Sequence, residues 1–208
     1  MNNDELVKIR NKNRRSMILL ATLFILPMLA AWFVLRNINT FMPSGTQNYG
    51  DLIHPARPLA TFSLQQKDGT AFGVKEMRGK WNVIYFGGND CTKVCQEALS
   101  KVHQARLGQG AEMHRVRDLY IDIDSGPISN KTAEFLKSVP DFSVLNGSAA
   151  EITRLLAQFK ATGVSPTEAG RLFIIDPHAN IMMTYKKTSY VRDLLKDLER
   201  LLKYSQIG

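Results

Sequence analysis

Hydrophobic and polar residues divide the chain into an N-terminal apolar segment and a longer part in which apolar clusters alternate with turns. Residues 17–35 contain no charged side chain. From residue 58 onward, short apolar runs such as Val83–Phe86 are typical of buried strands, and apolar residues repeated every three or four positions, as in 189–202, are typical of amphipathic helices. We predict strands at residues 61–64, 70–72, 83–86, 116–123, 142–145, 171–175 and 181–185, and helices at residues 91–106, 132–139, 149–159 and 189–202.

The elements predicted beyond residue 58 alternate between strands and helices. A hairpin comes first, followed by strand, helix, strand, helix, strand, helix, two strands and a terminal helix. Such an alternation implies a partly parallel sheet that helices cover on both faces. The order fits a thioredoxin-like layout, in which active cysteines lie at the start of the helix after a central strand. We therefore predict an α/β protein with a thioredoxin-like fold and one N-terminal transmembrane helix.

The apolar segment at residues 17–35 is long enough to cross a membrane. As a helix, its 19 residues would span about 28 Å at 1.5 Å per residue. Five basic residues precede the segment and only Arg36 follows it closely, so the positive-inside rule places the N-terminus in the cytoplasm. A cleaved signal peptide is the alternative, but residues 37–40 make a poor cleavage site. We therefore expect an uncleaved anchor.

The composition on either side of this anchor predicts the domain organisation. We expect a cytoplasmic basic tail at residues 1–16, a transmembrane anchor at 17–36, a linker at 37–57 and a thioredoxin-like domain at 58–208. The linker is assigned from its content of Asn, Thr, Ser, Gly and Pro. The expected location is the inner (plasma) membrane, as a single-pass protein with its globular domain on the periplasmic or extracytoplasmic side.

The charge balance does not indicate a nucleic-acid-binding protein. The 208 residues include 27 Lys and Arg against 19 Asp and Glu. Six of the basic residues lie within residues 1–36, so the rest of the chain is only mildly basic. Because no nucleic-acid recognition motif is present either, we expect no nucleic-acid partner.

The two cysteines of the chain, Cys91 and Cys95, are the candidate reactive residues. They follow the predicted strand Val83–Phe86, two glycines, and the expected helix caps Asn89 and Asp90. Their spacing is about one helical turn, so both sulfurs are expected on one face of a helix N-terminus, where the partial positive charge favours thiolates. Three interpretations follow: dithiol–disulfide exchange with Cys91 as nucleophile and Cys95 as resolving thiol, metal binding, or a static disulfide.

Several motifs of the predicted domain resemble those of the Sco/SenC family of thioredoxin-fold proteins. The resemblance covers roughly residues 58–204. The matching motifs are Asp68-Gly69, Gly79-Lys80, Phe86-Gly87 followed by Cys91-x-x-x-Cys95, and Ile175-Asp176-Pro177. That family is membrane-anchored and implicated in copper delivery to cytochrome c oxidase. The resemblance therefore implies copper as a ligand of Cys91 and Cys95, a redox role for the same two residues, and a cytochrome c oxidase subunit or another respiratory assembly factor as partner.

Two departures from the Sco/SenC pattern affect the expected copper site. The family usually has a proline after each cysteine, whereas this chain has Thr92 and Gln96. The family's third copper ligand is a histidine at a place that falls near Glu168, and no histidine lies between His114 and His178. We therefore do not expect the full Cys-Cys-His site, although two thiolates one turn apart can hold soft Cu(I).

Other residues are weaker candidates for the site. His178, Met182, Met183 and Glu168 are conceivable replacement ligands. The simpler interpretations are that His178 lies in a solvent-exposed turn, that the methionines fill the core, and that Glu168 lies in a solvated loop. The segment Ser165-Pro166-Thr167 resembles the cis-proline signature that faces the cysteine pair in thioredoxins, although it lies several residues too early.

Three functions remain open from the sequence. The first is assistance to cytochrome c oxidase assembly, by Cu(I) delivery or by reduction of a partner's copper-site cysteines through Cys91 and Cys95. The second is a general membrane-tethered thiol–disulfide oxidoreductase, and the third is a non-catalytic assembly scaffold. The copper affinity and the reduction potential of the cysteine pair distinguish them.

Overall fold

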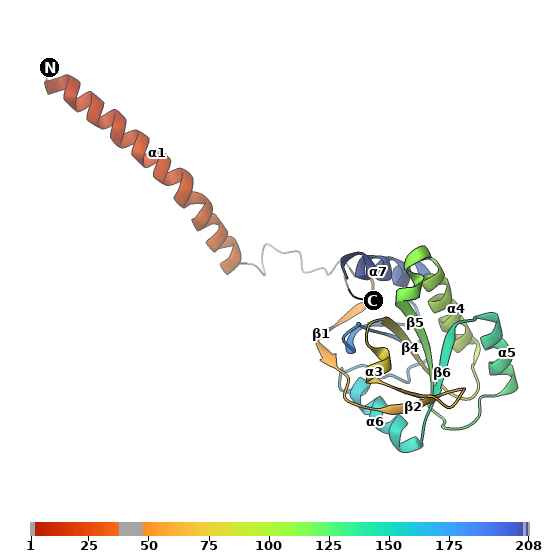
Figure 1. Cartoon of the computed structure of the whole chain (residues 1–208). Helices are drawn as coiled ribbons and strands as arrows, with labels where there is room; N and C mark the ends of the chain where they lie inside the picture. The colour runs from red at the N-terminus through yellow and green to blue at the C-terminus, as the bar shows by residue number, and fades with distance from the viewer. Residues whose placement is uncertain (1–2, 38–47, 206, 208) are drawn as a thin grey trace. The chain divides into compact units, whose positions relative to one another are not determined.

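The computed structural model describes residues 3–37, 48–205 and 207 of the chain (Figure 1). The chain divides into two compact units, Met1–Gln47 and Asn48–Gly208. Among the described residues, the first unit holds one helix and the second holds all the strands. The expected linker at residues 37–57 lies partly outside the described residues, because 38–47 fall between the two described ranges.

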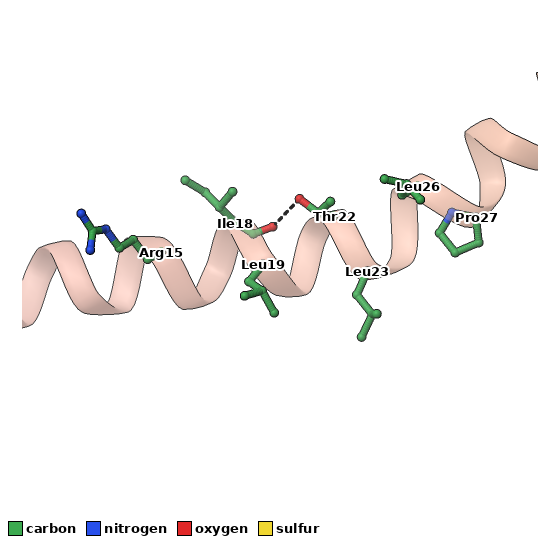
Figure 2. Close-up of a pocket in the computed structure, with 7 residues that line it drawn as sticks. All are labelled: Arg15, Ile18, Leu19, Thr22, Leu23, Leu26 and Pro27. Atoms are coloured by element: carbon green, nitrogen blue, oxygen red, sulfur yellow. Dashed lines mark hydrogen bonds between the residues drawn. The ribbon is translucent and has the colours of Figure 1, made fainter.

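Helix α1 (Asn3–Arg36) contains the apolar segment of the sequence. Its stretch Asn11–Arg36 is, by length and composition, a candidate membrane span. Figure 2 shows the Thr22 hydroxyl beside the Ile18 carbonyl oxygen, to which it donates a hydrogen bond of 2.8 Å. Pro27 lacks an N–H group and so leaves one helical hydrogen bond unmade, which membrane helices tolerate. The Thr22 hydroxyl is thus satisfied within the helix itself.

An eight-stranded mixed sheet forms the centre of the second unit. Its strands are β1 (Asp51–Pro58), β2 (Ser63–Gln66), β3 (Ala71–Gly73), β4 (Trp81–Gly87), β5 (Val116–Asp122), β6 (Phe142–Asn146), β7 (Leu172–Ile175) and β8 (Asn180–Tyr185). Their order across the sheet is β1-β8-β7-β4-β5-β6-β2-β3. The pairs β4–β5 and β5–β6 are parallel and the others are antiparallel. The prediction of an α/β protein with a partly parallel sheet is confirmed.

Helices cover both faces of the sheet and divide the core into two clusters. The helical elements are α3 (Val74–Met77), α4 (Lys93–Leu107), α5 (Asn130–Ser138), α6 (Ala149–Lys160), α7 (Val191–Tyr204) and the 3₁₀ helix η1 (Gly110–Arg115). Figure 1 shows α4 and α7 together, away from α6, and the two helices pack against each other. Alternate residues of β4 face opposite clusters: Val83 and Tyr85 lie with α4 and α7, whereas Ile84 and Phe86 lie with α6. Burial on both faces explains the continuous apolar run of β4.

Strand β1 extends the folded unit beyond the boundary expected from composition. It pairs antiparallel with β8, and an irregularity in the register interrupts the pairing. Seven of its eight residues are exposed, so the strand has no apolar alternation by which the sequence could reveal it. The unit therefore begins before residue 58, and strand β1 takes up most of the described part of the expected linker.

A buried carboxylate holds the first residues of this unit. Asp197 on α7 accepts hydrogen bonds at Oδ2 from the backbone N–H groups of Tyr49 and Gly50, both at 2.9 Å, and from the Tyr185 hydroxyl at 2.8 Å. A Cβ atom on Gly50 would lie 2.6 Å from the Tyr185 ring, so glycine permits this close approach. Hydrogen bonds to a charged acceptor are stronger than neutral ones, and they fix where the chain joins the sheet.

A second buried carboxylate, Asp118 on β5, lacks such partners. It is fully buried, and neither of its oxygens accepts a hydrogen bond from the described residues. The nearby Arg106 guanidinium instead pairs with Asp141 at 3.1 Å. Burial disfavours the charged form and raises the pKa of Asp118 to about 7; the positive charge of Arg106 opposes this rise and the negative charge of Asp141 adds to it.

The raised pKa of Asp118 predicts a stability that falls as pH rises. The unfolded chain releases this proton near pH 4, whereas the folded chain keeps it up to about pH 7, so the folded state binds the extra proton between these values. The full shift corresponds to about 4 kcal/mol. We expect Asp118→Asn to gain stability relative to the wild type as pH rises from 5 to 8, measured by chemical unfolding.

An exposed carboxylate on the same sheet serves as the control for this prediction. Asp51 is 60% exposed and pairs with Lys186 at 3.5 Å. Asp51→Asn removes the same formal charge and is expected to change the free energy of unfolding by a similar small amount at both pH values. Equal pH dependence in Asp118→Asn and the wild type would contradict the assignment.

Candidate redox site at the start of helix α4

The cysteines lie where β4 gives way to α4, but not both within the helix. Helix α4 begins at Lys93 with Thr92 as its N-cap, whose carbonyl oxygen accepts the first helical hydrogen bond from Gln96. The predicted helix start at Cys91, with Asn89 and Asp90 as caps, is therefore wrong by two residues. Thr92 has extended backbone angles, so the helix cannot extend back through it. Cys95 lies in the first helical turn, and Cys91 lies before the helix.

The structure joins Cys91 and Cys95 in a disulfide bond, with 5.2 Å between their Cα atoms. Both side chains belong to the core cluster under α4 and α7. Cys91 keeps 8% of its surface exposed and Cys95 keeps 3%, so Cys91 is the more accessible of the two. This order agrees with a nucleophilic role for Cys91 and a resolving role for Cys95.

Two glycines allow the loop before the cysteines to pass close to polar side chains. A Cβ atom on Gly87 would lie 2.5 Å from the Tyr120 hydroxyl oxygen, and one on Gly88 would lie 2.5 Å from Asp124 Oδ2. The Tyr120 hydroxyl donates a hydrogen bond to the Gly88 carbonyl oxygen. Burial, followed by the negative charge of Asp122, raises the pKa of Tyr120, which keeps this donor protonated at neutral pH.

Carboxylates at the end of β5 hold the same loop. Asp124 Oδ2 accepts a hydrogen bond from the Asn89 backbone N–H at 2.8 Å. In the orientation that satisfies both of its polar atoms, the Asn89 side-chain amide donates to Asp122 Oδ2 at 2.9 Å. Burial, reinforced by the charge of Asp124, raises the pKa of Asp122. These acids therefore act as acceptors for the cysteine loop.

The beginning of helix α5 contacts the loop from the other side. The Thr132 hydroxyl oxygen accepts a hydrogen bond from the Cys91 backbone N–H at 2.8 Å and donates one to the Asn89 carbonyl oxygen at 2.9 Å. The Ser129 backbone N–H donates to the same carbonyl oxygen at 3.0 Å. Sequence reasoning missed these contacts. The Ser129-x-x-Thr132 pattern signals a helix start, and Ser129 does cap α5, but the pattern says nothing of the loop 41 residues away.

The residues present fit a two-thiolate Cu(I) site better than a three-ligand site. Once reduced, Cys91 and Cys95 would supply two soft ligands whose Cα atoms lie 5.2 Å apart in the disulfide form. Across the part of the chain that the structure describes, no group of three or more His, Cys, Asp or Glu side chains could hold a metal ion.

Each replacement ligand considered from the sequence has another role in the structure. Glu168 forms an ion pair with Arg171. His178 is exposed in a turn, where its backbone N–H donates to Asp176. Met183 is fully buried in the core, and its sulfur lies 3.3 Å from the Tyr185 hydroxyl oxygen; Met182 packs against the same core cluster.

Pro166, in the segment Ser165-Pro166-Thr167 that resembles the thioredoxin signature, is not a cis-proline. Among the described residues, the cis peptide bond is the one between His54 and Pro55. The bond before Pro166 is therefore trans, and the resemblance to the thioredoxin signature is wrong at this position. Pro166 itself is buried, as a loop proline that packs against the domain.

Comparison with known sequences assigns the chain to a protein family. Residues 81–205 match the family described as "transmembrane-like, thioredoxin-like, C-terminal domain". The chain belongs to this family. Membership, together with the mixed sheet and the N-terminal candidate span, confirms the predicted thioredoxin-like fold.

Curated relatives agree with the resemblance found in the motifs. The Bos taurus protein named "Protein SCO2 homolog, mitochondrial" is 28% identical over 122 residues, which cover 55% of this chain and 45% of that protein. The chain thus spans less than half the length of this relative. The predicted resemblance to Sco/SenC proteins is confirmed.

Solved Sco structures share the fold. Bradyrhizobium japonicum ScoI with copper bound has a TM-score of 0.58 at 20% identity and covers 69% of this chain and 98% of its own. BsSco, described as a Sco family member with a disulfide switch, has a TM-score of 0.59 at 18% identity and covers 76% of this chain and 100% of its own. At these identities the likeness concerns the fold, which places the cysteine helix after a central strand in this chain.

Proposed function

We propose that this protein is a membrane-anchored dithiol protein that supports respiratory oxidase assembly by thiol–disulfide exchange at Cys91 and Cys95. The observation that carries the proposal is the Cys91–Cys95 disulfide at the start of α4, with Cys91 as the more exposed sulfur. A disulfide that closes a 15-residue loop is expected to stabilise a protein by about 3 kcal/mol, because it restricts the unfolded chain. The Cys91–Cys95 bridge spans a sequence separation of four residues and therefore restricts the unfolded chain less. By the same relation, a purely structural bridge contributes about 2 kcal/mol here, less than a bridge that closes a long loop.

The exchange reaction uses both sulfurs in sequence. In the reduced protein, the Cys91 thiolate attacks one sulfur of a partner disulfide, and a mixed disulfide forms as the first partner thiolate leaves. The Cys95 thiolate then attacks Cys91, which releases the second partner thiolate. Two electrons have passed to the partner, and the Cys91–Cys95 bond has formed. A dithiol reductant in the same compartment must reduce this bond before the next cycle.

An oxidase-related partner is supported by the relatives and by the anchor. BsSco is described as a member of a family of cytochrome c oxidase assembly proteins. A partner's copper-site cysteines must be reduced before they can bind metal, because thiolates are the ligands. A cytochrome c oxidase subunit or another respiratory assembly factor at the same membrane is therefore the proposed substrate.

The proposed topology has residues 1–16 in the cytoplasm, an anchor at 17–36, and the thioredoxin-like domain of residues 58–208, with strand β1 before it, outside. The clustered basic residues before the apolar segment support this orientation. The prediction is tested with a reporter enzyme that is active only outside the cytoplasm. We expect activity when it is fused after Gly208 of the full chain and none when it is fused before Met1 of the full chain; the reverse pattern would contradict the orientation.

The exchange function predicts that the cysteine pair equilibrates with small dithiols. We expect half-reduction of the full chain in detergent micelles in buffers poised between about −120 and −300 mV, the range of exchanging pairs. Mass spectrometry after alkylation measures the oxidised fraction of Cys91 and Cys95, and the double variant Cys91→Ser/Cys95→Ser gives the unreactive baseline. A pair that stays oxidised below about −300 mV would be a structural bridge and would favour the scaffold role.

Cu(I) carriage is the second candidate function, with copper as cargo. The close approach of the two sulfurs, which form a disulfide in the structure, favours it, as does the copper-bound Bradyrhizobium japonicum relative. We expect the reduced full chain to take Cu(I) from a strong competing chelator, and the Cys91→Ser and Cys95→Ser variants to lose most of that affinity. Equal competition by the wild type and both variants would remove the copper role and leave the exchange function standing.

A further inference from the structure

The inference concerns Thr132, which no part of the proposed exchange reaction uses. Thr132 lies in the first turn of α5 and is fully buried. Its hydroxyl oxygen is within hydrogen-bond distance of three groups: the Cys91 N–H at 2.8 Å, the Asn89 carbonyl oxygen at 2.9 Å and the Ser129 hydroxyl oxygen at 3.1 Å. A threonine hydroxyl has one proton to donate and two lone pairs to accept with, so these contacts use its full capacity.

The contacts matter because Cys91 lies outside the helix that holds its partner. Cys95 is fixed by the backbone hydrogen bonds of α4, which begins two residues after Cys91. The position of Cys91 is set by groups around it, and its buried N–H donates to Thr132. The carbonyl oxygen of Cys91 accepts a hydrogen bond of 3.2 Å from the Gln96 side chain, which belongs to α4. Thr132 thus joins the Cys91 backbone to α5.

We propose that Thr132 is a positioning residue for the cysteine pair, which favours the closed disulfide by holding the Cys91 backbone where its sulfur meets Cys95. The proposal rests on the exchange function proposed above and adds a residue that sets its equilibrium. Opening of the disulfide frees Cys91 to move, so bonds that fix its backbone stabilise the oxidised form more than the reduced form. Without the hydroxyl, the Cys91 N–H and the Asn89 carbonyl oxygen each lose a buried partner in the closed form.

The test compares Thr132→Val, which removes the hydroxyl, with Thr132→Ser, which keeps it. The oxidised fraction of Cys91 and Cys95 in the full chain is measured against graded glutathione buffers. We expect Thr132→Val to shift the equilibrium toward the dithiol by roughly 5- to 30-fold, the factor that corresponds to one or two lost hydrogen bonds. Thr132→Ser is expected to stay close to the wild type.

Thr184 supplies a matched control. Its hydroxyl is buried and donates to the Leu172 carbonyl oxygen at 2.9 Å, between strands β7 and β8. Thr184→Val should lower the free energy of unfolding without moving the redox equilibrium. If Thr132→Val also lowers only the free energy of unfolding, Thr132 is merely structural and the positioning role is overturned.

Amide hydrogen exchange tests the same role in the wild type and does not depend on a variant that folds. The Cys91 N–H is expected to exchange more slowly in the oxidised than in the reduced full chain, because its hydrogen bond to Thr132 belongs to the closed form. Equal rates in the two forms would overturn the positioning role. A wild-type pair that stays oxidised below the potential range given above for exchanging pairs would overturn the exchange function and the positioning role together. A pair that exchanges normally, but whose equilibrium does not change in Thr132→Val, would overturn the positioning role alone.

Discussion

The backbone between β4 and α4 cannot satisfy its hydrogen bonds by itself, and the candidate site depends on how other segments satisfy them. Buried backbone N–H and C=O groups are costly to leave unpaired. In this loop the Gly88 carbonyl oxygen, the Asn89 N–H and carbonyl oxygen, and the Cys91 N–H all bond to side chains or backbone of β5, of the loop after it and of α5. The neighbouring strand and the helix that follows it therefore hold the cysteine loop in place.

This constraint explains several features of the sequence around the loop. Glycines at 87 and 88 are required because Tyr120 and Asp124 lie within 2.5 Å of where a Cβ atom would be. The parallel pairing of β4 with β5 brings the ends of the two strands together, so that Asp122 and the residues after it reach the loop. The acidic residues at the end of β5 and just after it thus shape the candidate site by accepting hydrogen bonds from its loop.

Much of the fold could be predicted because burial leaves a clear pattern. The apolar run of β4 and the amphipathic face of α7 were both placed close to their observed bounds. Strand β1 was missed because its side chains are exposed and the pattern of its sequence therefore carries no signal of pairing. The spacing of four residues places Cys91 and Cys95 close together but leaves a disulfide and a metal site both open, whereas the contact of Thr132 with Cys91 depends on a tertiary arrangement that no local pattern reveals.

The central claim is that Cys91 and Cys95 form an exchanging pair in which Cys91 attacks first. The direct measurement is the rate at which reduced full-length Cys95→Ser and Cys91→Ser variants form a mixed disulfide with oxidised glutathione, followed as the mass of the adduct. The account predicts that Cys95→Ser, which retains the more exposed Cys91, reacts several-fold faster than Cys91→Ser. No adduct on either variant, or faster reaction at Cys95, would contradict it.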